Sequence, residues 1–230
     1  MMILERRDFM NVKQIEQQLE QSNFKREASD FKSLVKIYQL CHSGANEIGT
    51  KLENLDEEYS MTYDHNPIHH MEERMKSTSS LFEKLERKGY KPTIENVQKH
   101  IRDIAGIRVV TNYIDDIYRV EKALTEQSDV TLLKRKDYIE NPKKSGYRSL
   151  HLVVSVPVFQ SVGVSDVPVE IQIRTIGMDM WASLEHKLRY KTNADPKKVK
   201  QHSANLKAYA KELNDIETRM QAIFSDLQDH

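Results

Sequence analysis

Two acidic side chains, Asp103 and Glu170, stand in segments that are otherwise apolar or basic. Two carboxylates that meet from different strands are the ligand set that a hard Mg²⁺ ion needs. Basic residues from three elements would neutralise phosphate charge, and an exposed ring at Tyr147 offers a surface on which a base stacks. This combination suits phosphoryl-group transfer between nucleotides, where positioning and charge neutralisation do most of the catalysis.

The segment Ser145–His151 contains a glycine turn followed by the start of a strand. Side chains alternate sides along a strand, so Tyr147, Ser149 and His151 are expected on one face and Leu150 and Leu152 on the other. An aromatic ring, a hydroxyl and an imidazole then lie in line beside the basic loop at 141–144. The pattern predicts a place that holds a nucleotide.

Two further strands are expected to complete the wall of this site. Residues 103–110 read as a buried strand in which Arg108 projects opposite Ile107 and Val109. An unpaired buried charge is very costly, so Arg108 is expected to have a partner or a ligand. In residues 169–174, Glu170, Gln172 and Arg174 face away from the apolar residues of the same strand. If this strand lies beside residues 149–156, their polar faces adjoin.

A basic helix precedes these strands, within residues 74–84. Ser80 followed by Glu83 fits a capping box, although the helix starts equally well at Ser77. Arg74 and Lys76 would then lie just ahead of a helix N-terminus, whose free N–H groups favour phosphate. The alternative is a basic helix with an ordinary solvated face.

The rest of the chain reads as helices around a sheet. Residues 1 to about 62 are expected to be helical, with apolar residues at helical spacing, among them Val12, Ile15, Leu19, Phe31, Leu34, Val35 and Tyr38. A helix at 114–127 leads to a strand at 130–139. That strand is expected to carry Lys134, Lys136 and Tyr138 on one face and Leu133 on the other. Together these patterns predict an α+β fold with a mixed sheet of about five strands, flanked by helices, with long helices at both ends.

Two helices are expected at the C-terminal end. The first, at about 178–191, has Trp181, Leu184 and Leu188 on a face that is expected to be core. The second begins after Pro196, and its apolar residues step by three and four over about three heptads. This seam predicts either packing on the N-terminal helices or oligomerisation.

The bulk composition narrows the class of protein. The 230 residues carry 35 Lys and Arg against 35 Asp and Glu, and this balance argues against a general nucleic-acid coat. The single Cys41 suits a reducing cytoplasm, no signal peptide is visible, and no run of about 18 apolar residues predicts a membrane span. The seven glycines form neither Gly-x-Gly-x-x-Gly nor a P-loop. A protein of the cytoplasm, without a dinucleotide-fold or P-loop nucleotide site, is expected.

Four motifs in this order resemble the synthetase domain of RelA/SpoT-type alarmone synthetases, over residues 60 to 192. They are Asp103-Ile-Ala-Gly-Ile-Arg108, Lys143-Lys-Ser-Gly-Tyr-Arg-Ser-Leu-His151, Glu170-Ile-Gln-Ile-Arg-Thr175 and Trp181-Ala-x-x-Glu-His-x-Leu-x-Tyr190. The chain contains no His-Asp dipeptide of the family's hydrolase domain and has no room for its regulatory domains. It therefore looks like a stand-alone small alarmone synthetase.

The resemblance implies transfer of the β,γ-pyrophosphate of ATP to the ribose 3′-hydroxyl of GTP or GDP, with release of AMP. By the same resemblance, Arg74 and Arg108 sandwich adenine, and the phosphates and ribose of ATP are held by Lys76, Ser80, Lys84 and Arg87. Asp103 binds Mg²⁺. Glu170 is the general base for the 3′-hydroxyl and also a candidate metal ligand.

The acceptor GTP or GDP is assigned, by the same resemblance, to Lys136, Lys143, Tyr147, His151, Gln172 and Asp179. Lys136 stands where some relatives carry arginine, and Asp179 where some carry asparagine. The resemblance also implies a nucleotidyltransferase-like fold and a homotetramer. The expected divisions are N-terminal helices at 1–62, the synthetase domain at 63–192 and a C-terminal helix at 193–230.

Two other functions are compatible with the same residues. Some relatives place the pyrophosphate on the 3′ end of tRNA, and the zero net charge speaks against RNA as the acceptor. The other is a nucleotide- or RNA-binding module without catalysis, against which the retention of both Asp103 and Glu170 argues.

Overall fold

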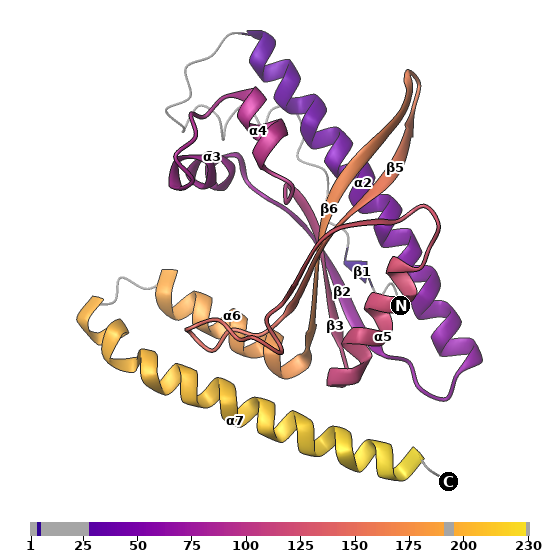
Figure 1. Ribbon diagram of the computed structural model, residues 1–230, viewed down its shortest axis with the longest axis vertical. Coiled ribbons are helices and arrows are strands. Elements are labelled where there is room, and N and C mark those ends of the chain that lie inside the picture. Colours follow the sequence, from indigo (N-terminus) through magenta and orange to yellow (C-terminus); the bar gives the residue numbers. More distant parts are fainter. Residues whose placement is uncertain (1–3, 6–27, 191–195, 229–230) are drawn as a thin grey trace.

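The computed structural model describes residues 4–5, 28–190 and 196–228, and its centre is one twisted mixed sheet (Figure 1). Within these residues the sheet has six strands, in the order β1-β2-β3-β6-β5-β4. They are β1 (Leu4–Glu5), β2 (Ile68–Met75), β3 (Ala105–Thr111), β4 (Thr131–Asp137), β5 (Leu150–Gln160) and β6 (Gly163–Thr175). The α+β class with terminal helices is confirmed.

The strand register brings the polar residues of different strands side by side. β5 and β6 form an antiparallel hairpin, and they pair His151 with Gln172 and Val153 with Glu170. β3 runs parallel to β6 on its other side, whereas β2 pairs with β3 and β4 with β5 in antiparallel fashion. The expected adjacency of the two polar strand faces is therefore confirmed.

Six helices flank the sheet in the described part of the chain. They are α2 (Ala28–Thr62), α3 (Thr78–Arg87), α4 (Ile94–His100), α5 (Ile114–Thr125), α6 (Ile176–Tyr190) and α7 (Pro196–Gln228). In Figure 1, α3 and α4 lie near one end of the central strands, and α6 and α7 lie near the other. No helix in the described ranges is long and apolar enough to cross a membrane.

One face of the sheet is closed by α2 and α5. The apolar residues of the central strands alternate with polar ones, and Ile107, Leu152 and Ile171 are fully buried against Ile117 and Leu124 of α5 and neighbouring residues of α2. Each such side chain stabilises the fold by about 1.5–3 kcal/mol relative to exposure. The opposite face of the same strands is left for polar side chains.

A second core, formed by α2, α3 and α4, fixes the entry to α3. Tyr38 of α2 is fully buried, and its hydroxyl donates a hydrogen bond to the carbonyl oxygen of Lys76 at 2.8 Å. The Lys76 N–H donates in turn to the carbonyl oxygen of Ile104 at 2.7 Å. Lys76 and the Ile104 segment, which leads into β3, are thus held together by backbone contacts.

The start of α3 resolves the alternative left open by the sequence. Ser77 is the N-cap, and its hydroxyl accepts the N–H of Ser80, so the helix starts at Thr78. Thr93 caps α4 in the same way, because its hydroxyl accepts the N–H of Asn96. Gly89, at a φ of +78°, follows the end of α3, in a conformation that glycine adopts at low cost.

Two expectations about the sheet are wrong in detail. Leu4–Glu5 pairs in parallel with β2 as a short strand, although residues 1 to about 62 were expected to be helical. With this strand the sheet has six strands, in agreement with the expected number of about five. Val12, Ile15 and Leu19 lie outside the described residues. In β4 an irregularity in the register between Leu132 and Lys134 places Leu133 beside Lys134 in one cavity wall, so the two do not point to opposite faces.

The apolar face of α6 is only partly core. Trp181 is buried and its indole N–H donates to the carbonyl oxygen of Leu206 at 2.9 Å, but Leu184 and Leu188 are 52% and 50% exposed. The reason is that α7 packs against α6 on the Trp181 side alone. α7 packs mainly against α6 and α5 rather than α2, so the expected packing on the N-terminal helices is not confirmed by the residues that the structure describes.

Candidate active site

Two rows of side chains cross the open face of the sheet. Cross-strand pairing aligns one row over five strands, Glu72, Arg108, Gln172, His151 and Lys136. The next row is Arg74, Gly106, Glu170, Val153 and Lys134. The alternation of the strands therefore delivers carboxylates, amides and cations to one surface, while their neighbours fill the core.

Gly106 opens the middle of the second row. A Cβ atom at this position would lie 2.9 Å from the carbonyl oxygen of Glu170 on the neighbouring strand. Glycine therefore permits the close approach of β3 to β6. It also leaves space beside the Glu170 carboxylate that any other side chain would fill.

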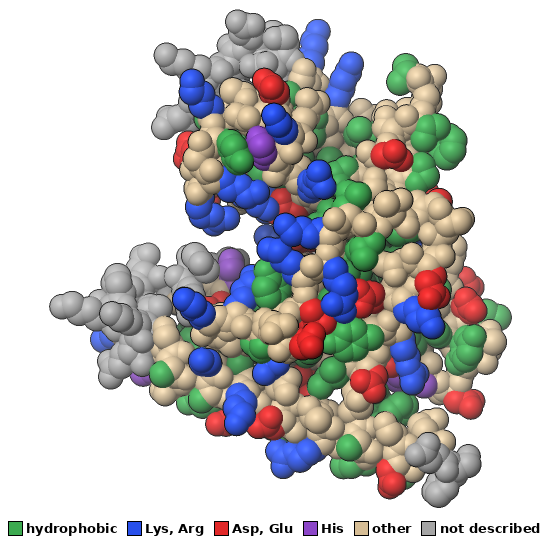
Figure 2. Space-filling view, in the orientation of Figure 1, with side chains coloured by type: hydrophobic (Ala, Val, Ile, Leu, Met, Phe, Trp, Pro, Cys, Tyr) green, Lys and Arg blue, Asp and Glu red, His purple; other side chains and the backbone are tan. Residues whose placement is uncertain are grey.

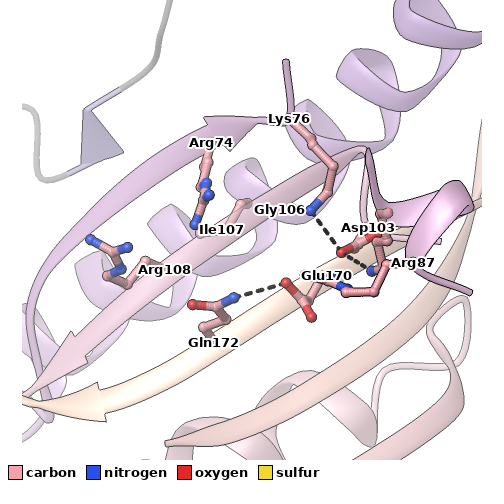
Figure 3. Close-up of a pocket in the computed structure, with 10 residues that line it drawn as sticks. Arg74, Lys76, Arg87, Asp103, Gly106, Ile107, Arg108, Glu170 and Gln172 are labelled. Atoms are coloured by element: carbon pink, nitrogen blue, oxygen red, sulfur yellow. Dashed lines mark hydrogen bonds and ion pairs between the residues drawn. The ribbon is translucent and has the colours of Figure 1, made fainter. Parts of the chain in front are cut away.

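A cavity of about 220 Å³ lies over this space. Its wall is formed by Arg74, Lys76, Lys84, Arg87, Asp103, Gly106, Ile107, Arg108, Glu170 and Gln172. Figure 2 shows the surface hollowed between the α3–α4 region and the α6 region, with Lys and Arg side chains around the hollow. Figure 3 shows Asp103 and Glu170 facing the same space, with Arg74 and Arg108 farther along the strands. The cavity is strongly cationic and holds two carboxylates.

Asp103 is bound by two lysines. Lys84 makes a short hydrogen bond to Asp103 Oδ2, and Lys76 Nζ lies 3.1 Å from the same oxygen. Burial alone raises the pKa of Asp103, but the hydrogen bond and charge of Lys84 and the charge of Lys76 outweigh it, so the pKa lies below its ordinary value. The other oxygen, Oδ1, is buried and accepts no hydrogen bond from any residue that the structure describes.

Glu170 is held by two residues of the polar rows. Gln172 Nε2 donates to Glu170 Oε2 at 2.8 Å, and His151 Nδ1 lies 3.5 Å from Oε1. Burial raises the pKa of Glu170, but His151 and Gln172 lower it below the ordinary value overall. Burial also lowers the pKa of His151 despite the carboxylate beside it. At neutral pH Glu170 is therefore an anion that accepts a hydrogen bond from a neutral imidazole.

The donor set is compatible with a bound Mg²⁺ ion. No group of three or more His, Cys, Asp or Glu side chains suited to a metal occurs among the residues described. Mg²⁺, however, is usually held by one or two carboxylates together with substrate phosphates and water. The unsatisfied Oδ1 of Asp103 and the carboxylate of Glu170, which line one cavity, fit that pattern.

A second, wider depression of about 910 Å³ adjoins the first. Glu170, Asp103, Lys84 and Arg87 belong to both, and the remaining wall includes Lys88, Lys99, Arg102, Leu133, Lys134, Lys136, Tyr138, Lys143 and His151. Lys143 Nζ lies 4.5 Å from the ring centres of both Tyr138 and Tyr147. Tyr147 and His151 are joined by a 2.8 Å contact between Oη and Nε2. The two carboxylates thus lie where two cationic cavities meet.

Most of the site residues expected from the sequence are brought together in these two cavities. Tyr147 instead lines a third depression of about 400 Å³, together with Arg74, Arg108 and Arg174, and its hydroxyl contacts His151 of the wider one. Ser80 is different: it is exposed at the start of α3, is bound to Ser77 and lines neither cavity. Asp179, expected at the acceptor nucleotide, contacts Arg108 at 3.4 Å and Arg174 at 3.0 Å instead of lining the wider depression.

The sequence placed Arg174 on the polar face of its strand but gave it no role, and it did not single out Gly106. Arg174 is buried and donates to Tyr147, Gln172 and Asp179. Arg174 alternates with apolar residues in the same way as Glu170 and Gln172, and this pattern could have identified it as a site residue. For Gly106 the sequence carries no signal, because its importance arises from the distance between two strands.

Residues 73–195 match the family model described as the region found in RelA / SpoT proteins. The chain belongs to this family. Two curated relatives from Bacillus subtilis strain 168 match it over most of their length. GTP pyrophosphokinase YwaC is 44% identical over 171 residues, which cover 74% of this chain and 80% of YwaC. GTP pyrophosphokinase YjbM is 42% identical over 156 residues, which cover 67% of this chain and 72% of YjbM.

A solved structure of this RelA/SpoT group matches the fold as well. The crystal structure of small alarmone synthetase 1 from Bacillus subtilis, bound to its product pppGpp, superposes with a TM-score of 0.72 at 35% sequence identity. The match covers 80% of this chain and 93% of the crystallised one. The resemblance noted from the four motifs is confirmed by these comparisons.

Proposed function

We propose that this protein is a (p)ppGpp synthetase, a GTP diphosphokinase that transfers the β,γ-pyrophosphate of ATP to the 3′-hydroxyl of GTP or GDP and releases AMP. The single observation that carries this function is the position of Asp103 and Glu170 where two cationic cavities meet. Membership of the RelA/SpoT family and the GTP pyrophosphokinases at 42–44% identity agree with it. The product is the alarmone of the stringent response.

ATP belongs in the smaller cavity in this proposal. Arg74 and Arg108 on neighbouring strands present two guanidinium groups, which stack on the flat adenine. Lys76, Lys84 and Arg87 lie at the other end, where they neutralise the triphosphate. Ser80 is retained as an ATP ligand only through the N-terminus of α3, because its side chain lies outside both cavities.

Glu170 is the proposed general base. The 3′-oxygen of the acceptor forms a bond to the β-phosphorus of ATP, the bond from that phosphorus to the α,β-bridging oxygen breaks, and the hydroxyl proton passes to Glu170. The lowered pKa keeps this carboxylate ionised and ready to accept the proton. His151 and Gln172 hold its two oxygens in place.

Asp103 and Glu170 are the proposed ligands of Mg²⁺. When bound, the ion would offset the negative charge that develops on the leaving AMP. Without the ion, Asp103 is compensated by Lys76 and Lys84. These lysines are then free to turn to the ATP phosphates once a cation takes their place at Asp103. Removal of divalent metal is therefore expected to abolish turnover.

The acceptor belongs in the wider depression. Tyr147 is the proposed stacking partner of guanine, and Lys136, Lys143 and His151 surround the ribose and phosphates. The exposed apolar residues of α7 support a homo-oligomer, and the homotetramer implied by the family resemblance remains part of the proposal. The cytoplasmic location and the division at residues 62 and 192 also stay predictions.

The decisive experiment identifies the product. The protein is incubated with Mg²⁺ and ATP labelled at the β-phosphate, with GDP, GTP or tRNA as the acceptor. The label is expected on a guanosine nucleotide with a 3′-pyrophosphate, and AMP is expected in equal amount. Transfer to tRNA alone would replace the proposed acceptor, and binding without transfer would mean a non-catalytic module.

A further inference from the structure

A continuous series of charged and polar contacts runs along the third depression, whose wall includes Arg108, Tyr147 and Arg174. It starts at Arg108, which donates to Glu72 at 2.9 Å and lies 3.4 Å from Asp179. Asp179 accepts a hydrogen bond from Arg174 at 3.0 Å. Arg174 donates in turn to Tyr147 at 2.7 Å. Residues assigned to opposite nucleotides are therefore linked through two side chains.

Arg174 is the centre of this series. Its side chain is 6% exposed, and besides Asp179 it binds Tyr147 Oη and Gln172 Oε1, the latter at 2.6 Å. Gln172 in turn donates a hydrogen bond from Nε2 to Glu170 Oε2 at 2.8 Å. A buried guanidinium with this many aligned acceptors has one allowed position, because loss of any acceptor leaves a donor unsatisfied.

Asp179 is shared between two arginines through one oxygen. Oδ1 receives both the Arg174 hydrogen bond and the charge of Arg108. The Arg108 atom nearest to Asp179 is Nε, which is buried and donates no hydrogen bond to any described residue, so this contact is an ion pair without a hydrogen bond. Burial and the like charge of Arg174 lower the pKa of Arg108, and Asp179 and Glu72 oppose this shift. Asp179 therefore sits between two cations that compete for it.

From this arrangement we infer that the Asp179–Arg174 pair couples the two nucleotide sites, so that binding of ATP and of the guanine nucleotide strengthen each other. The inference rests on the proposed function, because it uses the assignment of Arg108 to ATP and of Tyr147 to the acceptor. Asp179 and Arg174 are positioning residues in this scheme. They act through Arg108, Tyr147 and Gln172 and need not touch a substrate.

The physical basis is the order that the first ligand imposes. A base stacked on Arg108 removes water from it and fixes its guanidinium, which fixes the shared oxygen of Asp179. Arg174 is then held in the position that orients Tyr147 and Gln172. The entropic cost of ordering these side chains is then smaller for the second nucleotide, which therefore binds more tightly. Since coupling free energies are reciprocal, the guanine nucleotide must tighten ATP binding by the same factor.

The test is a binding cycle by calorimetry on the full chain with Mg²⁺. The affinity of a non-hydrolysable ATP analogue is measured without GDP and with saturating GDP, and the ratio is the coupling factor. We expect about fivefold or more for the wild type, a typical value for coupled sites. In Asp179→Asn, which keeps the shape but loses the charge, the factor is expected to fall to within about twofold of one.

Two further variants keep the test independent of folding. Arg174→Lys keeps the charge but reaches fewer of the four acceptors of Arg174, which are Ser149, Tyr147, Gln172 and Asp179, so an intermediate coupling factor is expected. Asp129→Asn breaks a comparable pair, Lys51–Asp129 at 2.7 Å, on a distant surface and should leave the factor unchanged. A wild type without coupling, or a folded Asp179→Asn with the full factor, would overturn the inference. Failure to bind either nucleotide would instead overturn the proposed function.

Discussion

At the scale of single residues, the state of Glu170 depends on its neighbours. Burial by itself raises the pKa of this carboxyl and so favours the neutral form, which accepts no proton from a hydroxyl. The hydrogen bonds from His151 and Gln172 reverse that effect. His151 in turn stays neutral because burial lowers its pKa, so it donates through Nδ1 while Nε2 accepts from Tyr147.

The opposing effects of burial and of the His151 contact on the pKa of Glu170 predict how the acid limb of the pH–rate profile changes in a variant. In His151→Ala one stabilising contact to the Glu170 anion is lost, so burial raises the pKa of Glu170. The carboxylate then becomes protonated at higher pH. The acid limb of kcat/KM is therefore expected to move to higher pH, alongside a lower plateau.

The control for this measurement is His69→Ala, which changes an exposed histidine on the rim of β2. Its acid limb should coincide with that of the wild type. An acid limb that stays in place or moves to lower pH in His151→Ala would show that His151 does not stabilise the Glu170 anion.

At the scale of elements, the site depends on how closely β3 and β6 approach. The two parallel strands pair Gly106 with Glu170. A methyl group on Gly106 would lie 2.9 Å from the Glu170 carbonyl oxygen. Because this oxygen belongs to the backbone, the close contact is relieved only if β6, which carries Glu170, moves away.

Gly106→Ala is therefore expected to destabilise the fold by about 1–3 kcal/mol, the usual cost of overpacking. It should also lower kcat more than the loss of folded protein explains, because Glu170 is displaced. Thermal unfolding and kcat at a temperature well below Tm measure the two effects. Wild-type kcat in a folded Gly106→Ala variant would mean that the strand spacing does not position Glu170.

Alternation along the strands made much of this face predictable. The positions of Arg108, Glu170 and Gln172 follow from the two-residue period once the core residues are recognised. Asp179 did not follow, because its place depends on how α6 crosses the end of the sheet. The strand β1 could not be predicted, because two residues are too few to show the alternation of a strand. Leu184 and Leu188 were misplaced because the covering helix α7 reaches only one side of α6.

At the scale of the whole molecule, α7 packs against the loop that carries Gly146 and Tyr147, and it also has an exposed apolar surface. A Cβ atom on Gly146, which has a φ of +97°, would lie 2.8 Å from Ala210 Cβ on α7. Farther along, Glu217 accepts the N–H of Gly177 at the start of α6 at 3.0 Å. A stripe of α7 beside this packed face exposes large apolar side chains, Tyr209, Ile216, Met220, Ile223 and Leu227.

This exposed seam predicts an oligomer that forms through α7. Replacement of Ile216 and Ile223 by Lys places two charges on the seam without touching the contacts of Ala210 or Glu217. The variant is expected to have a smaller solution mass than the wild type by light scattering. Lys211→Glu, a change on the same helix outside the seam, serves as the control. An unchanged mass in the double variant would place the interface elsewhere.

The central claim is that Glu170 performs the transfer between two separately bound nucleotides. Its most direct test is single-turnover transfer by Glu170→Gln, compared with nucleotide binding by the same preparation. The amide keeps the shape and the contact to Gln172 but accepts no proton. We predict that transfer falls by about 10²–10⁴-fold, the usual contribution of a general base, while ATP and GDP bind within a few fold of the wild type. Transfer at the wild-type rate by the folded variant would contradict the account.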